Sequence, residues 1–320
     1  MVQIACIGEV MIELASTSSA DPEPKTLSFA GDTYNTALTL ARLGIDCSYV
    51  TRLGDDLYSE AIVAHLRQEG IDTQCVTRQA GSLPGLYMIH NDADGERHFF
   101  YWRDRTPARQ LFHNSEETAR LETALTGTEM IYLSGITLAI IGPEGRANLL
   151  ALLERLKQGG TRLAFDSNYR PKLWKSPQTA QRATKQFLGL TDIALLTLDD
   201  EDLLWEGKGD SIASLKRRYK NLPIAEFVLK RGPEDVVLIE GGQEQSVTVP
   251  KVTPIVDTTA AGDTFNAGYL AARLNGLSSH AAAEQANRCA GLIIQHRGGV
   301  IDREVFLSQW YGGPHAKTRV

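Results

Sequence analysis

Residues 256–274 read VDTTAAGDTFNAGYLAARL, a run of small residues followed by a helical pattern. Its second half has the apolar spacing of a helix. The turn before that spacing is nearly bare of side chains, because Ala260, Ala261 and Gly262 precede a single carboxylate, Asp263. The free N–H groups of a helix start attract anions, and small residues let a phosphate reach the backbone. We therefore expect an anion site at this turn.

The carboxylate of Asp263 follows directly after this expected anion site. A carboxylate repels a phosphate, so it is poorly placed as a phosphate ligand. It is well placed to accept a proton from a hydroxyl that attacks the phosphate. The pattern suggests phosphoryl transfer, in which the anion site holds the migrating group and the carboxylate aligns the nucleophile. The plain alternative is an acidic residue in the first turn that the helix dipole stabilises.

Composition places the chain among ordinary globular proteins. It has 320 residues, of which 42% are hydrophobic and 22% charged, enough for one large domain or two smaller ones. A net charge of −6 argues against sequence-independent nucleic-acid binding but allows one local basic pocket. No apolar run is long enough to span a membrane, and the N-terminal segment resembles a strand more than a signal peptide. The four scattered cysteines are expected to be buried thiols of a cytoplasmic protein.

Apolar runs and helical spacing alternate along the chain. Strands are expected at about 2–7, 47–50, 129–134, 162–166, 192–197, 224–229, 235–240 and 245–249. Helices are expected at about 33–43, 57–69, 144–157, 178–188, 262–275, 279–295 and 302–310. This alternation predicts an α/β protein whose mostly parallel sheet is covered by helices.

One segment breaks the alternation. Residues 85–102, GLYMIHNDADGERHFFYW, hold two strand-like runs around a turn at 91–95, which predicts a hairpin. Residues 12–32 are expected to add strands to this small β unit. The predicted division is a core of residues 1–11, 33–84 and 105–320, with a β unit of residues 12–32 and 85–104.

Two motifs carry a family resemblance. DTTAAGDTFNAGYL resembles, position for position, the C-terminal signature of the PfkB-type (ribokinase-like) carbohydrate kinases. AGDTYNTALTLARLG resembles their second hallmark, with Gly31, Asn35, Gly44 and Gly54 at the family's spacing and a departure at Thr33. The resemblance covers essentially the whole chain.

That resemblance implies a ribokinase-like three-layer α/β/α fold, with ATP as the phosphoryl donor and Mg²⁺ as its partner. The small β unit is then a lid over the sugar site, and because such lids often pair, a homo-oligomer is expected. Asp263 becomes the base for the attacking hydroxyl, and residues 260–262 hold the phosphoryl group. Activation by a monovalent cation such as K⁺ near Asp257 is left open.

Several strings, among them IGEVMIEL, GERHFFYWR and FDSNYRPKLW, resemble one branch of the family, the 2-keto-3-deoxygluconate kinases. The implied reaction is phosphorylation of that sugar acid at C6. Its carboxylate needs a cation, and Arg103 and Arg170 each offer a planar fork, with a solvated surface charge as the plain alternative. Fructose, ribose, a deoxy-inositol acid and the galactonate epimer remain alternative substrates. A non-catalytic sugar or nucleotide sensor is the alternative outside enzymes.

Further sugar contacts follow from the same resemblance. Tyr87 and Tyr101 are expected to meet the sugar acid, with plain packing in the lid as the alternative. Strand alternation places Tyr101 on the same face as the arginine two residues later. Gly31 is expected to let the sugar approach the backbone. Asp32 and Asn35 offer an acceptor and a mixed donor–acceptor to hydroxyls, although Asn35 also fits as an ordinary polar residue of a first turn.

The nucleotide side departs from the family pattern. VLKRGPED stands where many relatives have Thr-x-Gly-x-x-Gly, so Gly232 matches and Lys230 replaces the threonine as a partner for phosphate. Thr197 and Asp200 hold the positions of an Asn-x-x-Glu pair that organises magnesium and its waters, and no direct metal ligand is expected. Asn287 falls on a helix used near the adenine, with a buried or capping role as the alternative. The expected nucleotide contacts are completed by Asn168 and Gly262.

Overall fold

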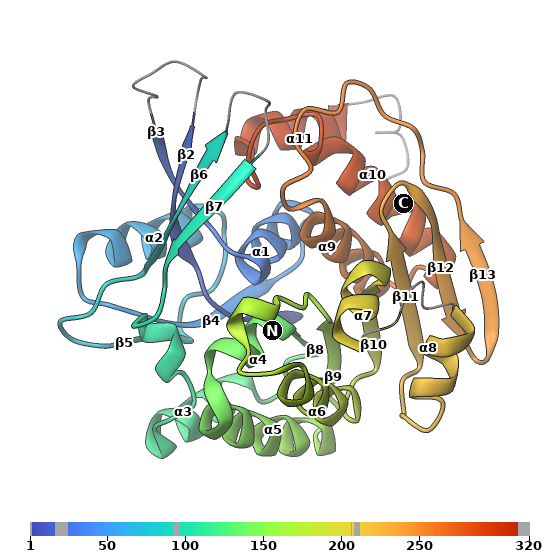
Figure 1. Ribbon diagram of the computed structural model, residues 1–320. Helices are drawn as coiled ribbons and strands as arrows, with labels where there is room; N and C mark the ends of the chain where they lie inside the picture. The colour runs from blue at the N-terminus through green and yellow to red at the C-terminus, as the bar shows by residue number, and fades with distance from the viewer. Residues whose placement is uncertain (1, 17–24, 92–96, 206, 208–211, 313–320) are drawn as a thin grey trace.

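A computed structural model describes residues 2–16, 25–91, 97–205, 207 and 212–312 (Figure 1). Its larger sheet consists of β1 (Ile4–Ile7), β4 (Cys47–Leu53), β5 (Val76–Arg78), β8 (Met130–Ser134), β9 (Arg162–Asp166), β10 (Ile193–Thr197), β11 (Glu226–Arg231), β12 (Glu234–Glu240) and β13 (Gln243–Val247). The strand order is β13-β12-β11-β10-β9-β8-β1-β4-β5. From β5 to β11 all neighbours are parallel, and only β12 and β13 join antiparallel. The predicted mostly parallel sheet is confirmed.

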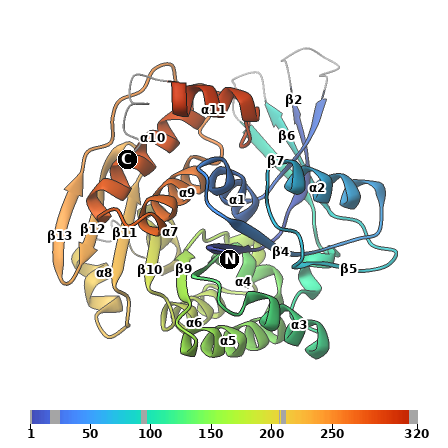
Figure 2. The same ribbon diagram turned by 180° about the vertical axis from the view of Figure 1, so that it is seen from behind.

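Helices cover both faces of this sheet (Figures 1 and 2). On one face lie α1 (Asp32–Arg42), α2 (Leu57–Gln68), α9 (Ala261–Leu274) and α10 (Ser279–Ile293). On the other lie α3 (Ser115–Leu125), α4 (Gly135–Ile140), α5 (Gly142–Gln158), α6 (Pro177–Leu188) and α8 (Ile212–Tyr219). Further along the chain, α7 (Leu198–Trp205) follows β10, and α11 (Arg303–Gly312) packs against α10.

Strand β1 shows why three layers form. Ile4 and Cys6 point into the core beneath α1 and α9, whereas Ala5 and Ile7 point into the core on the opposite face. All four side chains are fully buried, because a parallel strand between two helical layers must be apolar on both sides. An uninterrupted apolar run therefore marks this strand in the sequence.

The second sheet contains β2 (Met11–Ser16), β3 (Lys25–Ala30), β6 (Gly85–Asn91) and β7 (Arg97–Trp102), in the order β3-β2-β6-β7. The predicted hairpin is confirmed, since β6 and β7 pair antiparallel, while its turn lies outside the described residues. The expected strands within 12–32 are β2 and β3. Strand β2 pairs parallel with β6, which joins the two segments. Figure 1 shows this sheet projecting beside α1 and α2.

Several short elements are absent from the predictions, namely β5, α3, α4, α7 and α8. Strand β5 and helices α4, α7 and α8 are at most eight residues long, so each has too few apolar positions to show a period. Helix α3 is longer, but Leu121 and Leu125 are the only large apolar side chains that it buries. The four cysteines are free and buried, as expected. Across the described ranges, the search for a helix apolar and long enough to cross a bilayer found none.

Candidate active site

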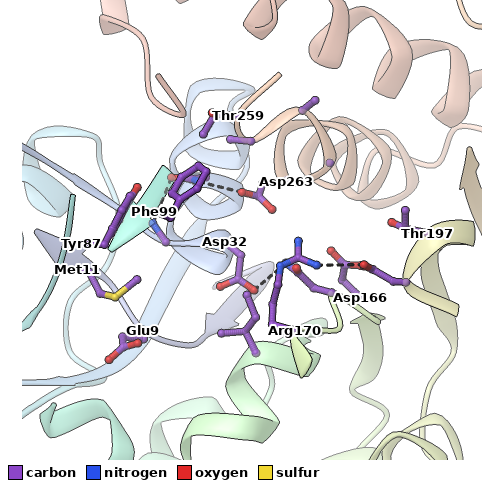
Figure 3. Close-up of a pocket in the computed structure, with 18 of the residues that line it drawn as sticks. Glu9, Met11, Asp32, Tyr87, Phe99, Asp166, Arg170, Thr197, Thr259 and Asp263 are labelled. Carbon is purple, nitrogen blue, oxygen red and sulfur yellow. Dashed lines mark hydrogen bonds and ion pairs between the residues drawn. The ribbon is translucent and has the colours of Figure 1, made fainter. Parts of the chain in front are cut away.

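A cavity of about 900 Å³ lies where the parallel strands end. The register pairs Ser134 with Asp166 and Thr197 with Lys230, so the ends of β8 to β11 meet at one edge. This edge is the usual ligand site of an open α/β sheet. Figure 3 shows Tyr87 and Phe99 on one side of the cavity, Asp166 and Thr197 on the other, and Asp32 and Asp263 between them.

Most residues predicted for the site come together here. Those that line the cavity are Gly31, Asp32, Asn35, Tyr87, Tyr101, Arg103, Asn168, Arg170, Thr197, Asp200, Lys230, Ala260, Ala261, Gly262 and Asp263. They come from both sheets, α1, α7 and the start of α9. Residues more than 200 positions apart thus share one wall, as the Asn35–Asp263 contact shows directly.

Helix α9 begins directly at the cavity. Ala260 has a left-handed backbone (φ 58°), and its carbonyl accepts the N–H of Thr264 at 2.9 Å. The first turn places Asp263 so that its Oδ2 accepts the Asn35 Nδ2 donor at 2.8 Å. Burial raises the pKa of Asp263 to about 8, and the negative charge of Asp32 adds to the effect. A carboxyl group with such a pKa suits a general base near neutral pH.

A cation lies beside the same turn. The Nζ atom of Lys230 is 3.9 Å from the place that a Cβ atom on Gly262 would take. Lys230 donates to Asn266 Oδ1 at 2.9 Å and to Asp166 Oδ1 at 3.3 Å, which holds its ammonium in place. The N–H groups of the first turn have no partner inside the helix. Together the ammonium and the turn form a local site for an anion.

Asp32 is held from two directions at the base of the cavity. Its Oδ2 accepts the hydroxyl of Ser134 and the Nδ2 donor of Asn168, the latter at 3.1 Å. Burial raises the pKa of Asp32. Asn168 has a left-handed backbone (φ 30°), and its Oδ1 is buried without a hydrogen-bond partner. That buried oxygen is an acceptor that no described residue satisfies.

Both arginines expected to bind a substrate carboxylate already contact a protein carboxylate. Arg103, which is buried, donates through Nη2 to Glu9. Arg170, whose side chain is 53% exposed, donates through Nη1 to Asp200 Oδ1 at 3.0 Å. Burial raises the pKa of Asp200, and the Arg170 charge opposes this rise. Neither arginine is a simple solvated charge.

The second sheet contributes an aromatic wall. Tyr87 is buried and donates its hydroxyl to Glu13, and its ring stacks on that of Tyr101 with 5.7 Å between centroids. Phe99 stacks on Tyr101 from the next position on the same face, at 6.4 Å. Tyr101 and Arg103 share a face as alternation predicts, since the guanidinium carbon lies 5.9 Å from the Tyr101 ring centre.

Three predicted positions have other local roles. Asn287 and Gly232 are not among the residues that line the cavity. Asn287 donates to the carbonyl of Thr248 at 3.2 Å, which matches its alternative as a buried structural residue. Gly232 has φ 60° in the turn between β11 and β12. A Cβ on Gly31 would lie 2.2 Å from the Glu9 carbonyl oxygen, so tight backbone packing alone requires glycine there.

Other lining residues have no role in the sequence predictions, notably Glu9, Phe99, Asp166 and Lys172. Glu9 follows β1 closely and Asp166 ends β9. Polar residues just after parallel strands meet at one edge, and this rule was the signal available for both. Their partners, Arg103 and Lys230, lie far away in the chain and could not be inferred from local sequence.

Comparison with known proteins agrees with this arrangement. The model of the pfkB family carbohydrate kinases matches residues 1–304. The chain is 42% identical over 310 residues to the 2-dehydro-3-deoxygluconokinase of Escherichia coli K12, covering 94% of this chain and 98% of that protein. It is 43% identical over 309 residues to the Dickeya dadantii 2-dehydro-3-deoxygluconokinase, covering 94% and 97%.

Solved structures give the same fold. The 2-dehydro-3-deoxygluconokinase from Thermotoga maritima superposes with a TM-score of 0.82 at 23% identity, over 98% of this chain and 100% of that one. A putative ribokinase II from E. coli gives 0.83 at 21% identity, over 97% and 100%. The fold is therefore ribokinase-like, as predicted. With the match to the family model over nearly its whole length, the chain belongs to the pfkB family of carbohydrate kinases.

Proposed function

We propose that the protein transfers the γ-phosphoryl group of ATP to the C6 hydroxyl of 2-keto-3-deoxygluconate. The observation that carries the reaction type is the position of Asp263, held by Asn35 in the first turn of α9 and beside the Lys230 ammonium. The relatives named 2-dehydro-3-deoxygluconokinase, at 40–43% identity, support this sugar acid as the substrate.

In the proposed mechanism, Asp263 accepts the proton of the C6 hydroxyl as its oxygen attacks the γ-phosphorus in line. The Ala261 N–H donates to the carbonyl of Thr258 at 3.2 Å, so the N–H groups of Gly262 and Asp263, with the Lys230 ammonium, are proposed to face the charge that develops on the phosphoryl oxygens. Because these donors are fixed before the reaction, little reorganisation is needed at the transition state. The second sheet acts as a lid that excludes water from the reacting groups.

The cavity suits Mg²⁺ as the partner of ATP. Asp166, Asp199 and Asp200 line it, but among the described residues no three metal-ligating side chains come together to hold an ion directly. Mg²⁺ would therefore be held mainly by the phosphates of ATP and by waters. When bound, Mg²⁺ would neutralise part of the phosphate charge, with Asp200 acting through waters. Thr197, Asn168, Lys230 and Gly262 are the proposed nucleotide contacts, and Gly232 and Asn287 are proposed near them, outside the cavity wall.

At the sugar end, Arg103 and Arg170 are proposed to share the substrate carboxylate, and Tyr87 and Tyr101 to flank the chain of the sugar acid. Gly31, Asp32 and Asn35 are proposed to meet its hydroxyls. A monovalent cation beside Asp257 is part of the proposal, and activity in K⁺ compared with tetramethylammonium tests it. We place the reaction in the cytoplasm.

A homo-oligomer through the lid completes the proposal. Phe100 and Trp102 lie on β7, at the end of the sheet order, with 47% and 57% of their surface exposed. Such exposed aromatic side chains are typical of an interface. Sedimentation of the wild type and a Trp102→Lys variant tests it, and a wild type that remains monomeric at micromolar concentrations overturns it.

The substrate is tested by incubating the protein with MgATP and a panel of acceptors. The panel contains 2-keto-3-deoxygluconate, its galactonate epimer, fructose and ribose. ADP release identifies the acceptor, and phosphorus NMR locates the phosphate on C6. Asp263→Asn is expected to lose turnover by about 10²–10⁴-fold while still binding ATP. Equal turnover of all four acceptors, or a fully active Asp263→Asn variant, contradicts the proposal.

A further inference from the structure

Glu9 forms a buried ion pair at the sugar end of the cavity. Its carboxylate lies in the connection between β1 and β2, and only 2% of the residue is exposed. One oxygen, Oε2, accepts the Nη2 donor of Arg103. The other, Oε1, accepts the hydroxyl of Thr106. Each oxygen of Glu9 therefore has its own donor.

Because the two Glu9 oxygens have different donors, part of the Arg103 guanidinium is left without a hydrogen-bond partner. The two oxygens of a carboxylate often both accept hydrogen bonds from one arginine, as those of Glu69 do from Nε and Nη2 of Arg42. At Arg103 the Nε donor is buried without a partner, because Thr106 holds the second Glu9 oxygen. Arg103 lines the cavity, and its Nη1 has no hydrogen-bond partner among the described residues, so this nitrogen is the donor open to the cavity.

The pair also sets the charge at this end of the cavity. Arg103 is 7% exposed, and with Glu9 beside it the two charges cancel. A neutral sugar entering here meets a balanced pair. A sugar acid brings a second carboxylate to the same guanidinium, close to that of Glu9, and like charges at such distances in a buried site repel strongly.

We propose that Glu9 is a specificity-determining residue, an internal counter-ion that competes with the substrate carboxylate for Arg103, and that Thr106 limits this competition by holding one Glu9 oxygen away. The inference rests on the proposed function, because it assumes that a sugar acid binds beside Arg103. Glu9 neutralises the buried Arg103 guanidinium while no sugar acid is bound. The Thr106 hydroxyl keeps the pairing weak enough for a sugar acid to bind.

Two substitutions are expected to change acid binding in opposite directions. Glu9→Gln keeps the shape and still accepts from Arg103, but it removes the negative charge. The dissociation constant of 2-keto-3-deoxygluconate should fall about tenfold relative to wild type. Thr106→Val removes the hydroxyl and frees Glu9 to take both Nε and Nη2 of Arg103. The dissociation constant should then rise about tenfold. Thr106→Ser keeps the hydroxyl and should restore wild-type binding.

Calorimetry without nucleotide measures these constants. D-Gluconate and glucitol serve as a matched pair of probes that differ only in the carboxylate, and competition against the sugar acid gives their affinities. The ratio of gluconate to glucitol affinity should rise in Glu9→Gln and fall in Thr106→Val. The ADP dissociation constant should stay the same in both. Glu304→Gln, which removes an exposed carboxylate on α11, controls for the change in net charge.

The calorimetry results distinguish the proposed role of Glu9 from two other roles. A merely structural Glu9 would lower the affinity for acid and neutral ligands alike in both variants, and that result overturns the inference. Weaker acid binding in Glu9→Gln with unchanged glucitol binding would make Glu9 a positioning residue without competition, which also overturns it. If the wild type binds the acid in calorimetry but does not phosphorylate it, the proposed reaction fails while the counter-ion role still stands.

Discussion

Asn35 of α1 donates to Oδ2 of Asp263 at the start of α9, across 2.8 Å and 228 positions of sequence. The two helices pack side by side on one face of the sheet. The contact supplies a donor that favours the charged form of Asp263, against the burial that favours the neutral form. The reactivity of the proposed base therefore depends on how α1 and α9 pack.

The pH profile should report this contact. Asp263 must lose its proton to act as a base, so kcat/KM should rise as the pH rises through its pKa of about 8. Asn35→Ala removes the donor to the charged form and should move this rise upward by about one pH unit. Steady-state kinetics between about pH 6 and pH 10 measure the shift. A midpoint that stays in place or moves downward contradicts the assigned role of Asn35.

Asp263→Asn should be more stable than the wild type at alkaline pH. With a pKa raised from 3.8 to about 8, folded Asp263 holds a proton that the unfolded chain has lost. The free energy of unfolding of the wild type therefore falls as the pH rises from about 4 to 8. The variant lacks this titration, so its advantage should grow over that window, to on the order of a few kcal/mol.

Urea unfolding at acidic, neutral and alkaline pH measures this difference. The advantage should be smallest near pH 4 and level off above about pH 8. A difference that does not change with pH would show that Asp263 titrates alike in the folded and unfolded states.

Two glycines of the site should respond differently to alanine. Gly31→Ala pushes a Cβ to within 2.2 Å of the Glu9 carbonyl, so it should lower the free energy of unfolding by about 1–3 kcal/mol or more. Gly262→Ala meets no atom closer than 3.9 Å and should fold normally. Its methyl group covers the proposed phosphate site, however, and turnover should fall at least about tenfold. Thermal unfolding combined with kinetics separates the two effects, and a stable, fully active Gly262→Ala variant contradicts the anion site.

Arg170→Ala should leave the fold intact and impair binding of the sugar acid. Its ion pair with Asp200 involves a side chain that is 53% exposed, so its loss should cost less than about 1 kcal/mol of stability. The KM for the sugar acid should rise about 10-fold or more, because a charge-assisted donor is lost. Arg170→Lys keeps the charge without the fork and should lie between. An equal rise in KM for fructose would mean that Arg170 does not recognise the carboxylate.

Local sequence was sufficient for the elements with strong patterns. The apolar run of β1, the glycine-ended helices α1 and α2, and the two runs of the β6–β7 hairpin all lie within a few residues of their predicted bounds. The short helices α4 and α7 start directly after strands and bury few large side chains, so no period was long enough to reveal them.

The sequence predicted those site residues whose role follows from the local sequence around them. It predicted less well those whose role depends on a contact with a residue distant in the chain. Asp263 and the small residues before it follow from the physics of a helix start. The pairing of Arg103 with Glu9, of Arg170 with Asp200, and of Lys230 with Asp166 does not. Those contacts join strands and helices distant in sequence, so only the folded chain reveals that these three cations of the cavity already face an acid.

The parallel pairing of β2 with β6 has a consequence for chimeras between relatives. Any genetic crossover placed between residues 31 and 84 would give the hybrid β2 and β3 from one parent and β6 and β7 from the other. The seam would then run through the middle of the small sheet, at the backbone ladder between Met11–Ala15 and Gly85–Ile89. Exchanging acceptor preference between two such enzymes therefore requires two coordinated segment swaps, not one.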